Sequence, residues 1–171
     1  MSNELATIKS ILQTTPTRWT ALTAALSAEL LTARPAAAEW SALECLVHLI
    51  DTEAIFQTRL QAFLSGHDFA AFNPDEQGSK VGPQTRLTDL AARYDHLRQA
   101  SLAALAAVTP ADLQRTARHA ELGQVTLAQM VNEWAAHDLN HTLQAEKALM
   151  QPFIAQCGPW QIYFQDQVIA K

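Results

Sequence analysis

The stretch VNEWAAHDLNHTLQAE at residues 131–146 decides how the whole chain is interpreted. It is rich in good helix formers, and within it His137 and His141 stand four residues apart. Side chains at that spacing share one helix face, so the two imidazoles can converge on one point. The same H-x-x-x-H spacing holds zinc in helix-based metalloenzymes. A metal needs a further ligand, and His48, in the helical run SALECLVHLIDTE, is the best-placed candidate.

Histidine pairs at this spacing have an ordinary explanation too, because many are solvated or are core residues with satisfied hydrogen bonds. Here the neighbours on each helix face mix polar and apolar side chains, which is typical of a pocket inside a bundle. Those neighbours are Glu44, Thr52 and Ile55 around His48, and Met130, Glu133 and Gln144 around His137 and His141. Three nitrogen ligands with positions left open are typical of a catalytic metal, which lowers the pKa of bound water or of a thiol to about 7.

The composition indicates a single soluble domain over residues 1–171. The chain is long enough for a complete hydrophobic core, and 49% of its residues are apolar. No run approaches the roughly 20 apolar residues of a membrane span, and the start MSNELATIKS lacks a signal-peptide pattern. Cys45 and Cys157 are far apart in sequence and predict no disulfide framework. We therefore expect a cytoplasmic protein.

The charge pattern argues against polyanionic partners. The net charge of −5 combines 12 basic with 17 acidic residues, and the basic residues form no cluster. Nucleic acids and anionic membranes require a positive surface that neutralises phosphate groups. We therefore expect neither partner, and expect a small-molecule substrate instead.

Caps and apolar spacing predict an all-α protein, a four-helix bundle with a short extra helix and an irregular apolar tail. The short helix is expected after the Thr109-Pro110 start, followed by a short extended pair around Gly123. The long helices are expected at residues 4–26 with a restart or kink at Pro16, at 42–64 after a capping box of Ser41 and Glu44, at 87–105, and from a capping box of Thr126 and Gln129 to about Met150.

Two further stretches have no predicted long helix. Residues 66–84 contain three glycines and two prolines and are expected to form a long loop, a length that is often functional. The tail at residues 152–164 is apolar without a helical period. Such a tail is expected to pack on the bundle or on a second copy of the chain, so it is the candidate contact of a homodimer.

Two carboxylates are candidates for catalysis, since Glu44 and Glu133 each precede a candidate ligand by four residues. The capping box already explains Glu44. Trp134 and Gln144 are the candidates for the pocket lining. The remaining residues considered each have an ordinary structural explanation. Asp51 and Asp138 are second-sphere partners of the histidines or, as the simpler explanation, surface charges; Cys45 is a core thiol; Trp19 and Trp40 are core or helix-entry aromatics; and His67, His96 and His119 are solvated.

Two motifs give the chain a family resemblance. Residues 40–53 read W-S-x-x-E-x-x-x-H-L-x-D-x-E, and H-D-L-x-H follows at 137–141, preceded by G-x-V-T-L at 123–127. Together they resemble the DinB/YfiT-like family of metal-dependent enzymes. The resemblance covers the chain from the first expected helix to Met150. The resemblance implies a four-helix bundle holding a divalent metal, commonly nickel or zinc, on His48, His137 and His141. Characterised members of that family include S-transferases that use bacillithiol or mycothiol, and a mycothiol-dependent maleylpyruvate isomerase.

The sequence therefore predicts a metal-dependent enzyme that activates water for hydrolysis or a low-molecular-weight thiol for transfer to an electrophile. One alternative is a di-iron carboxylate bundle, although that class pairs Glu and His three residues apart rather than four. A second alternative is a non-enzymatic bundle that binds a ligand or partner through its apolar tail, with the histidines packed in the core.

Overall fold

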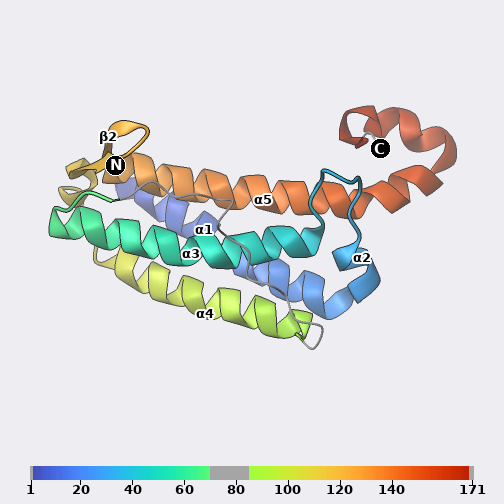
Figure 1. Cartoon of the computed structure of the whole chain (residues 1–171), viewed down its shortest axis with the longest axis horizontal. Coiled ribbons are helices and arrows are strands. Elements are labelled where there is room, and N and C mark those ends of the chain that lie inside the picture. The colour runs from blue at the N-terminus through green and yellow to red at the C-terminus, as the bar shows by residue number, and fades with distance from the viewer. Residues whose placement is uncertain (1, 70–84, 170–171) are drawn as a thin grey trace.

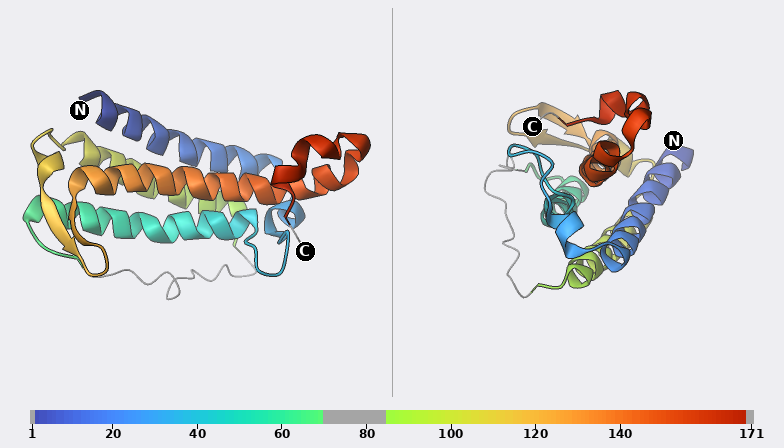
Figure 2. Two further views of the ribbon diagram at one scale, coloured as in Figure 1. Left: turned by 90° about the horizontal axis from the view of Figure 1, so that it is seen from above. Right: turned by 90° about the vertical axis from the view of Figure 1, so that its right-hand side faces the viewer.

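The computed structural model describes residues 2–69 and 85–169. Four long helices lie side by side along its length: α1 (Ser2–Ala25), α3 (Ala42–Ser65), α4 (Leu87–Ala106) and α5 (Leu127–Gln156) (Figure 1). α1 and α3 each pack against both α4 and α5, so α1 and α3 stand diagonally across the bundle (Figure 2). The predicted all-α four-helix bundle is confirmed. No helix within the described ranges has the length and hydropathy needed to cross a bilayer.

α1 runs through Pro16 without a break, so the predicted restart there is wrong. Proline has no N–H, and in a helix it leaves the carbonyl four residues earlier without its usual donor. That carbonyl belongs to Leu12, and it accepts a hydrogen bond of 2.8 Å from Nη1 of Arg98 on α4. A buried side chain from another helix thus replaces the bond that Pro16 removes.

The sequence signals at the helix ends are largely confirmed. Ser41 and Glu44 form the capping box that starts α3, and Gly66 ends it with a left-handed φ of 71°. Thr126 and Gln129 form the capping box of α5. α5 continues to Gln156 with Pro152 inside it, so the predicted end near Met150 is wrong.

The remaining short elements occupy the two ends of the bundle. α2 (Ala28–Thr32) follows α1, and the predicted short helix is the 3-10 turn η2 (Asp112–Gln114). The predicted extended pair is a two-stranded antiparallel hairpin of β1 (Thr116–His119) and β2 (Gly123–Thr126), with Thr116 opposite Thr126. The long loop predicted at 66–84 falls mostly outside the described residues.

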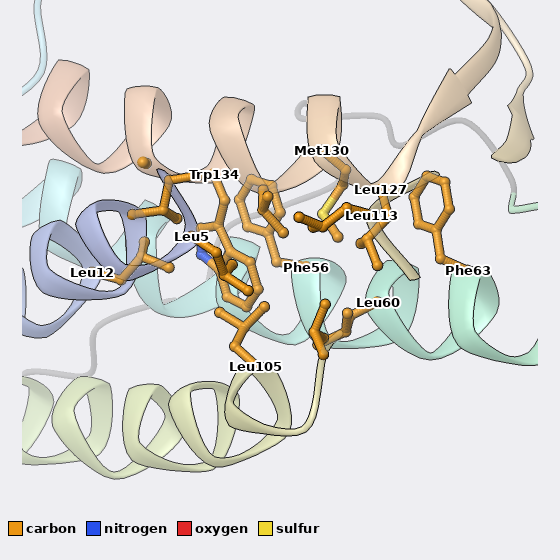
Figure 3. Close-up of a cluster of buried hydrophobic side chains, with 14 of the residues drawn as sticks. Leu5, Leu12, Phe56, Leu60, Phe63, Leu105, Leu113, Leu127, Met130 and Trp134 are labelled. Carbon is orange, nitrogen blue, oxygen red and sulfur yellow. The ribbon is translucent and has the colours of Figure 1, made fainter. Parts of the chain in front are cut away.

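The buried hydrophobic side chains form two clusters along the bundle. One lies toward the hairpin and contains Leu12, Phe56, Leu105 and Trp134 (Figure 3). The other lies toward the opposite end and is built around Trp19.

A fully buried ion cluster holds α3, α4 and α5 together. The guanidinium of Arg98 donates to Glu53 at 2.9 and 2.7 Å and to Asp138 at 2.5 and 3.0 Å. Arg98 is 0% exposed, and the two carboxylates are each 1% exposed. Burial opposes the charge of Arg98, but the bonds to both carboxylates outweigh it and raise its pKa. Asp138 is therefore a buried ion-pair partner, and its simpler interpretation as a surface charge is wrong.

The C-terminal segment is more regular than the sequence suggests. It forms a 3-10 helical element, η3 (Gly158–Gln167), which projects beyond the end of the bundle beside α5 (Figures 1 and 2). Gln151 holds it in place, because its side chain donates to Gln167 O at 2.9 Å and accepts from Ile169 N at 3.0 Å. η3 buries none of its residues, and Trp160 and Tyr163 remain 65% and 74% exposed. Of the predicted apolar tail at 152–164, Ile154 at the end of α5 is buried, whereas the large apolar side chains of η3 remain exposed.

Candidate metal centre

Three imidazoles from two helices meet in the middle of the bundle. His48 comes from α3, and His137 and His141 come from successive turns of α5. One ring nitrogen of each residue lies within 4.8 Å of the other two. Nε2 of His48 and Nε2 of His137 are 3.1 Å apart, and the ring of His141 lies 4.4 and 4.5 Å from the rings of His48 and His137. Residues 89 positions apart in sequence therefore present nitrogen lone pairs to one small volume.

The hydrogen bond of His141 indicates which of its nitrogens is available. Its Nδ1 lies 2.9 Å from Oε1 of Gln144, an oxygen that can only accept. Nδ1 therefore carries the hydrogen, and Nε2 keeps its lone pair. Gln144, predicted to line the pocket, instead orients a ring, a role that partners of metal-bound histidines often have.

The surroundings keep the three rings uncharged. Burial and the neighbouring ring of His141 lower the pKa of His48 to about 4. Burial, together with His141 and His48, lowers the pKa of His137 to about 3. Burial also lowers the pKa of His141, against the opposing effects of Gln144 and Asp138. At neutral pH all three are in the neutral form that a metal ligand requires.

The donor set fits a zinc-like divalent ion. A tetrahedral ion with bonds of about 2.0–2.1 Å places its nitrogen ligands roughly 3.3 Å apart, close to the 3.1 Å between His48 and His137. Two neutral imidazoles at this distance can share at most one hydrogen, and the hydrogen bond of His141 to Gln144 uses its Nδ1 and leaves its Nε2 available to an ion. Imidazole nitrogen suits zinc and nickel among the common ions. Three ligands also leave a coordination position open.

The histidines line a cavity of about 360 Å³ between α3 and α5, within the size range of small-molecule sites. The three rings line one end, Glu133 lines the wall one helical turn before His137, and Arg59 lines it about three turns along α3 from His48. The side chains that line it are Trp40, His48, Thr52, Ile55, Phe56, Arg59, Glu133, His137 and His141.

The aromatic residues differ from their predicted roles. Trp40, expected only as a core or helix-entry residue, stacks on His141 with ring centroids 5.7 Å apart and lies 5.1 Å from His48. Trp134, expected in the pocket lining, is 0% exposed and lies in the core, where Phe56 stacks on it at 4.8 Å. Phe56 therefore occupies the wall position that Trp134 was expected to take.

Of the two candidate catalytic carboxylates, only Glu133 lines the cavity. Glu44 is held by the capping box and by ion pairing to Arg34, with one oxygen 2.9 Å from Nε of that residue, and it does not line the cavity. Glu133 lines the cavity one helical turn before His137. One side of Glu133 meets solvent, yet burial in the pocket wall raises the pKa of its carboxyl against the opposing effect of Arg59.

The other residues considered from sequence lie outside the site. Cys45 is a buried core thiol, and burial raises its pKa to about 12. Asp51 does not line the cavity, although its charge reaches His48. His67 and His96 are exposed as expected, whereas His119 is only 8% exposed, so its predicted solvated state is wrong.

Sequence reasoning missed Arg59 and Arg98. The burial of Arg98 could be predicted from sequence, because it stands four residues after Tyr94 and three before Ser101 on the buried stripe of α4. A charged residue on such a stripe requires a buried partner. Arg59 stands eleven residues after His48, close to three helical turns, which puts both on one face of α3. This shared face follows from the sequence, but it does not by itself predict that Arg59 lines the same cavity as His48.

Two solved structures share this architecture. YfiT from Bacillus subtilis, described as a probable metal-dependent hydrolase with an unusual four-helix bundle topology, superposes with a TM-score of 0.76 at 14% identity, over 86% of this chain and 87% of that one. A DinB-like protein, YjoA, also from Bacillus subtilis, gives a TM-score of 0.57 at 20% identity, over 84% and 90% of the two chains. Among proteins with curated descriptions, none matches significantly.

The family model described as the DinB superfamily matches residues 11–145, which include all three histidines, the whole of α3 and the part of α5 that carries His137 and His141. The match extends over most of the bundle and stops before the C-terminal segment. This chain belongs to the DinB superfamily.

Proposed function

We propose that this protein is a metal-dependent enzyme whose divalent ion, zinc or nickel, is held by His48, His137 and His141. The observation that carries the proposal is the convergence of three neutral ring nitrogens within 4.8 Å of one another, at one end of a cavity. Structural metal sites usually close all four positions with protein ligands, whereas three ligands beside a cavity are typical of catalytic sites. The site therefore has the form of a centre that acts on a small molecule.

When bound at such a site, a divalent ion lowers the pKa of a coordinated water or thiol toward neutrality and so supplies a nucleophile. The protein's own residues perform the other tasks. Glu133, whose raised pKa brings its carboxylate closer to the working range of a general base, accepts a proton from the nucleophile or returns it to the leaving group. Trp40 and Phe56 form apolar walls that hold the substrate and limit access of water.

Hydrolysis and thiol transfer both fit this arrangement. Hydrolysis is favoured by the description of YfiT, which shares the fold. Thiol transfer to an electrophile is favoured by the family resemblance of the motifs around the three histidines, and it would use a low-molecular-weight thiol as the second small molecule. The two reactions need the same ligands and the same base, and they differ in the molecule that occupies the open position.

Metal analysis tests the proposal. The protein is purified without a nickel resin and its metal content is measured by plasma mass spectrometry, before and after dialysis against zinc. We expect one zinc or nickel ion per chain, and a melting temperature that rises with metal and falls with chelator, since an ion that binds only the folded state stabilises it. His48→Ala and His141→Ala are expected to lose the ion. His96→Ala, an exposed histidine on α4, serves as the matched control.

The two alternatives predict different results. A di-iron carboxylate protein would need clustered Glu side chains, and within the described residues the group that could hold an ion is the histidine triad. Iron content with an oxygen-sensitive visible spectrum would support that alternative. A non-enzymatic bundle would show the same melting temperature with metal and with chelator, and that result would contradict our proposal.

A further inference from the structure

The end of the cavity opposite the histidines holds a cation that the proposed reaction does not use. Arg59 stands eleven residues after His48 on α3, about 16 Å further along the helix axis. Its side chain lines the same cavity as the triad, and its charge acts on both Glu133 and His137. Arg59 therefore lines the part of the cavity that lies further along α3 from the rings.

Packing positions this guanidinium, but the part of the chain that the structure describes does not satisfy its hydrogen bonds. Its central carbon lies 5.3 Å from the ring centre of Phe69, and one terminal nitrogen lies 3.5 Å from Nε2 of His119. His119 Nδ1 accepts from the backbone N–H groups of Glu121 and Leu122, at 3.2 and 3.3 Å. In the neutral ring, Nε2 must then carry the hydrogen, so it meets Arg59 as a second donor.

No carboxylate in residues 2–69 and 85–169 lies within ion-pair distance of Arg59. The contrast with Arg98 is direct, because Arg98 is more deeply buried and bonds two carboxylates. Burial lowers the pKa of Arg59, and Glu133 opposes that shift only through its field. A half-buried guanidinium in a cavity, held by an aromatic ring and lacking an acceptor among the residues that the structure describes, gains most from a bound anion.

We infer that Arg59 binds a carboxylate of the substrate, and that the enzyme acts on organic monoacids whose reacting group lies at the other end of the molecule. This inference rests on the proposed function, since it assumes that the triad holds the reacting end. The planar fork of a guanidinium matches a carboxylate through two parallel hydrogen bonds. Aromatic and aliphatic walls between the two ends, Phe56 and Ile55 among them, suit an apolar connecting chain.

The charges in the cavity favour a carboxylate over a phosphate. Arg59 is the one cationic side chain among the described residues of the lining, and the charge of Glu133, which also lines the cavity, acts on it. A phosphate dianion would bring two charges to a single cation and would be repelled by the neighbouring carboxylate. A carboxylate brings one charge, which one guanidinium neutralises.

A pair of simple thiols tests the inference by binding alone. 6-Mercaptohexanoate and 6-mercaptohexanol share a thiol for the zinc ion and an apolar chain, and they differ in the carboxylate. Their affinities for zinc-loaded protein are measured by calorimetry, after a separate titration has established zinc binding. Since hydrogen bonds to charged groups contribute about 1.5–3 kcal/mol, we expect the acid to bind at least roughly tenfold more tightly than the alcohol.

Three variants locate the effect. Arg59→Gln is expected to remove the preference for the acid and leave the affinity for the alcohol unchanged. Arg59→Lys, which keeps the charge and loses the fork, is expected to fall between. Arg93→Gln, an exposed residue on α4, changes the net charge equally and is expected to keep the full preference.

Each result has a defined meaning. The inference is overturned if the unmodified protein binds the acid and the alcohol equally tightly, or if the preference for the acid persists in Arg59→Gln. Neither result contradicts the proposed metal site. Absence of zinc binding in the first titration overturns the proposed function, and the inference with it.

Discussion

Replacing Arg98 with methionine tests whether the buried ion cluster holds the bundle together beneath the metal site. Arg98 makes hydrogen bonds to Glu53, Asp138, Tyr94 Oη and the Leu12 carbonyl, and it is 0% exposed. Methionine fills similar space and donates nothing. The substitution therefore leaves the buried carboxylates of Glu53 and Asp138 without their cation. It also leaves the Leu12 carbonyl without a hydrogen-bond donor, because Pro16 supplies none.

The expected loss is large relative to the stability of a domain. Breaking one partner out of a buried ion pair costs about 3–5 kcal/mol. Two stranded carboxylates place Arg98→Met at the upper end of that range, against a total stability of about 5–15 kcal/mol. Urea denaturation followed by circular dichroism measures the difference. The exposed Arg93→Met is the matched control, and its effect is expected to stay within about 0.5 kcal/mol.

Two further variants keep the test decisive if Arg98→Met does not fold. Arg98→Lys retains a charge but loses the fork that reaches both carboxylates, so an intermediate loss is expected. Removing the stranded charges as well, in a triple variant with Glu53→Leu and Asp138→Leu, is expected to recover much of the stability. A loss below about 1 kcal/mol for Arg98→Met would refute the reasoning, because the cluster would then contribute no more than a surface ion pair.

Three further predictions concern acid, catalysis and assembly. His48 and His137 have folded-state pKa values of about 4 and 3, below the 6.5 of the unfolded chain. Their neutral forms therefore favour folding at neutral pH, and the metal-free protein should lose stability as pH falls from 6.5 toward 4; His137→Gln should reduce that slope in denaturation curves. Glu133→Gln should slow hydrolysis of p-nitrophenyl acetate by zinc-loaded protein by about 100-fold. Glu44→Gln, which keeps a capping box of the kind that Gln129 forms, should leave the rate unchanged and lower stability by less than about 1 kcal/mol. If the exposed aromatic side chains of η3 mediate a homodimer, sedimentation should show a dimer that Tyr163→Ser weakens; identical monomers for both chains would contradict this.

The sequence was most informative where local rules act alone. Both capping boxes and the glycine stop of α3 follow from neighbouring residues, and each was predicted to within a residue or two. The i, i+4 spacing of His137 and His141 likewise forces the two rings onto one face of any helix.

Predictions failed where distant contacts override local preference. Local rules predict an interruption at Pro16 and an end of the helix before Pro152, but both helices run through their prolines, and at Pro16 a side chain from α4 supplies the missing donor. Asp138 looked like a surface charge because its partner, Arg98, lies 40 residues away. Trp40 lines the cavity only once α3 and α5 are paired, and the spacing of Arg59 from His48 gives its helix face but not the cavity that it lines.

The central claim is that the three histidines hold one metal ion, and anomalous diffraction tests it most directly. Crystals of protein purified without a nickel resin are exposed to no metal other than zinc, and data are collected on both sides of the zinc absorption edge. Our account predicts one anomalous peak about 2.0–2.1 Å from a ring nitrogen of each of His48, His137 and His141. A zinc-saturated crystal with no peak between the three rings, or with zinc bound only elsewhere, would contradict it.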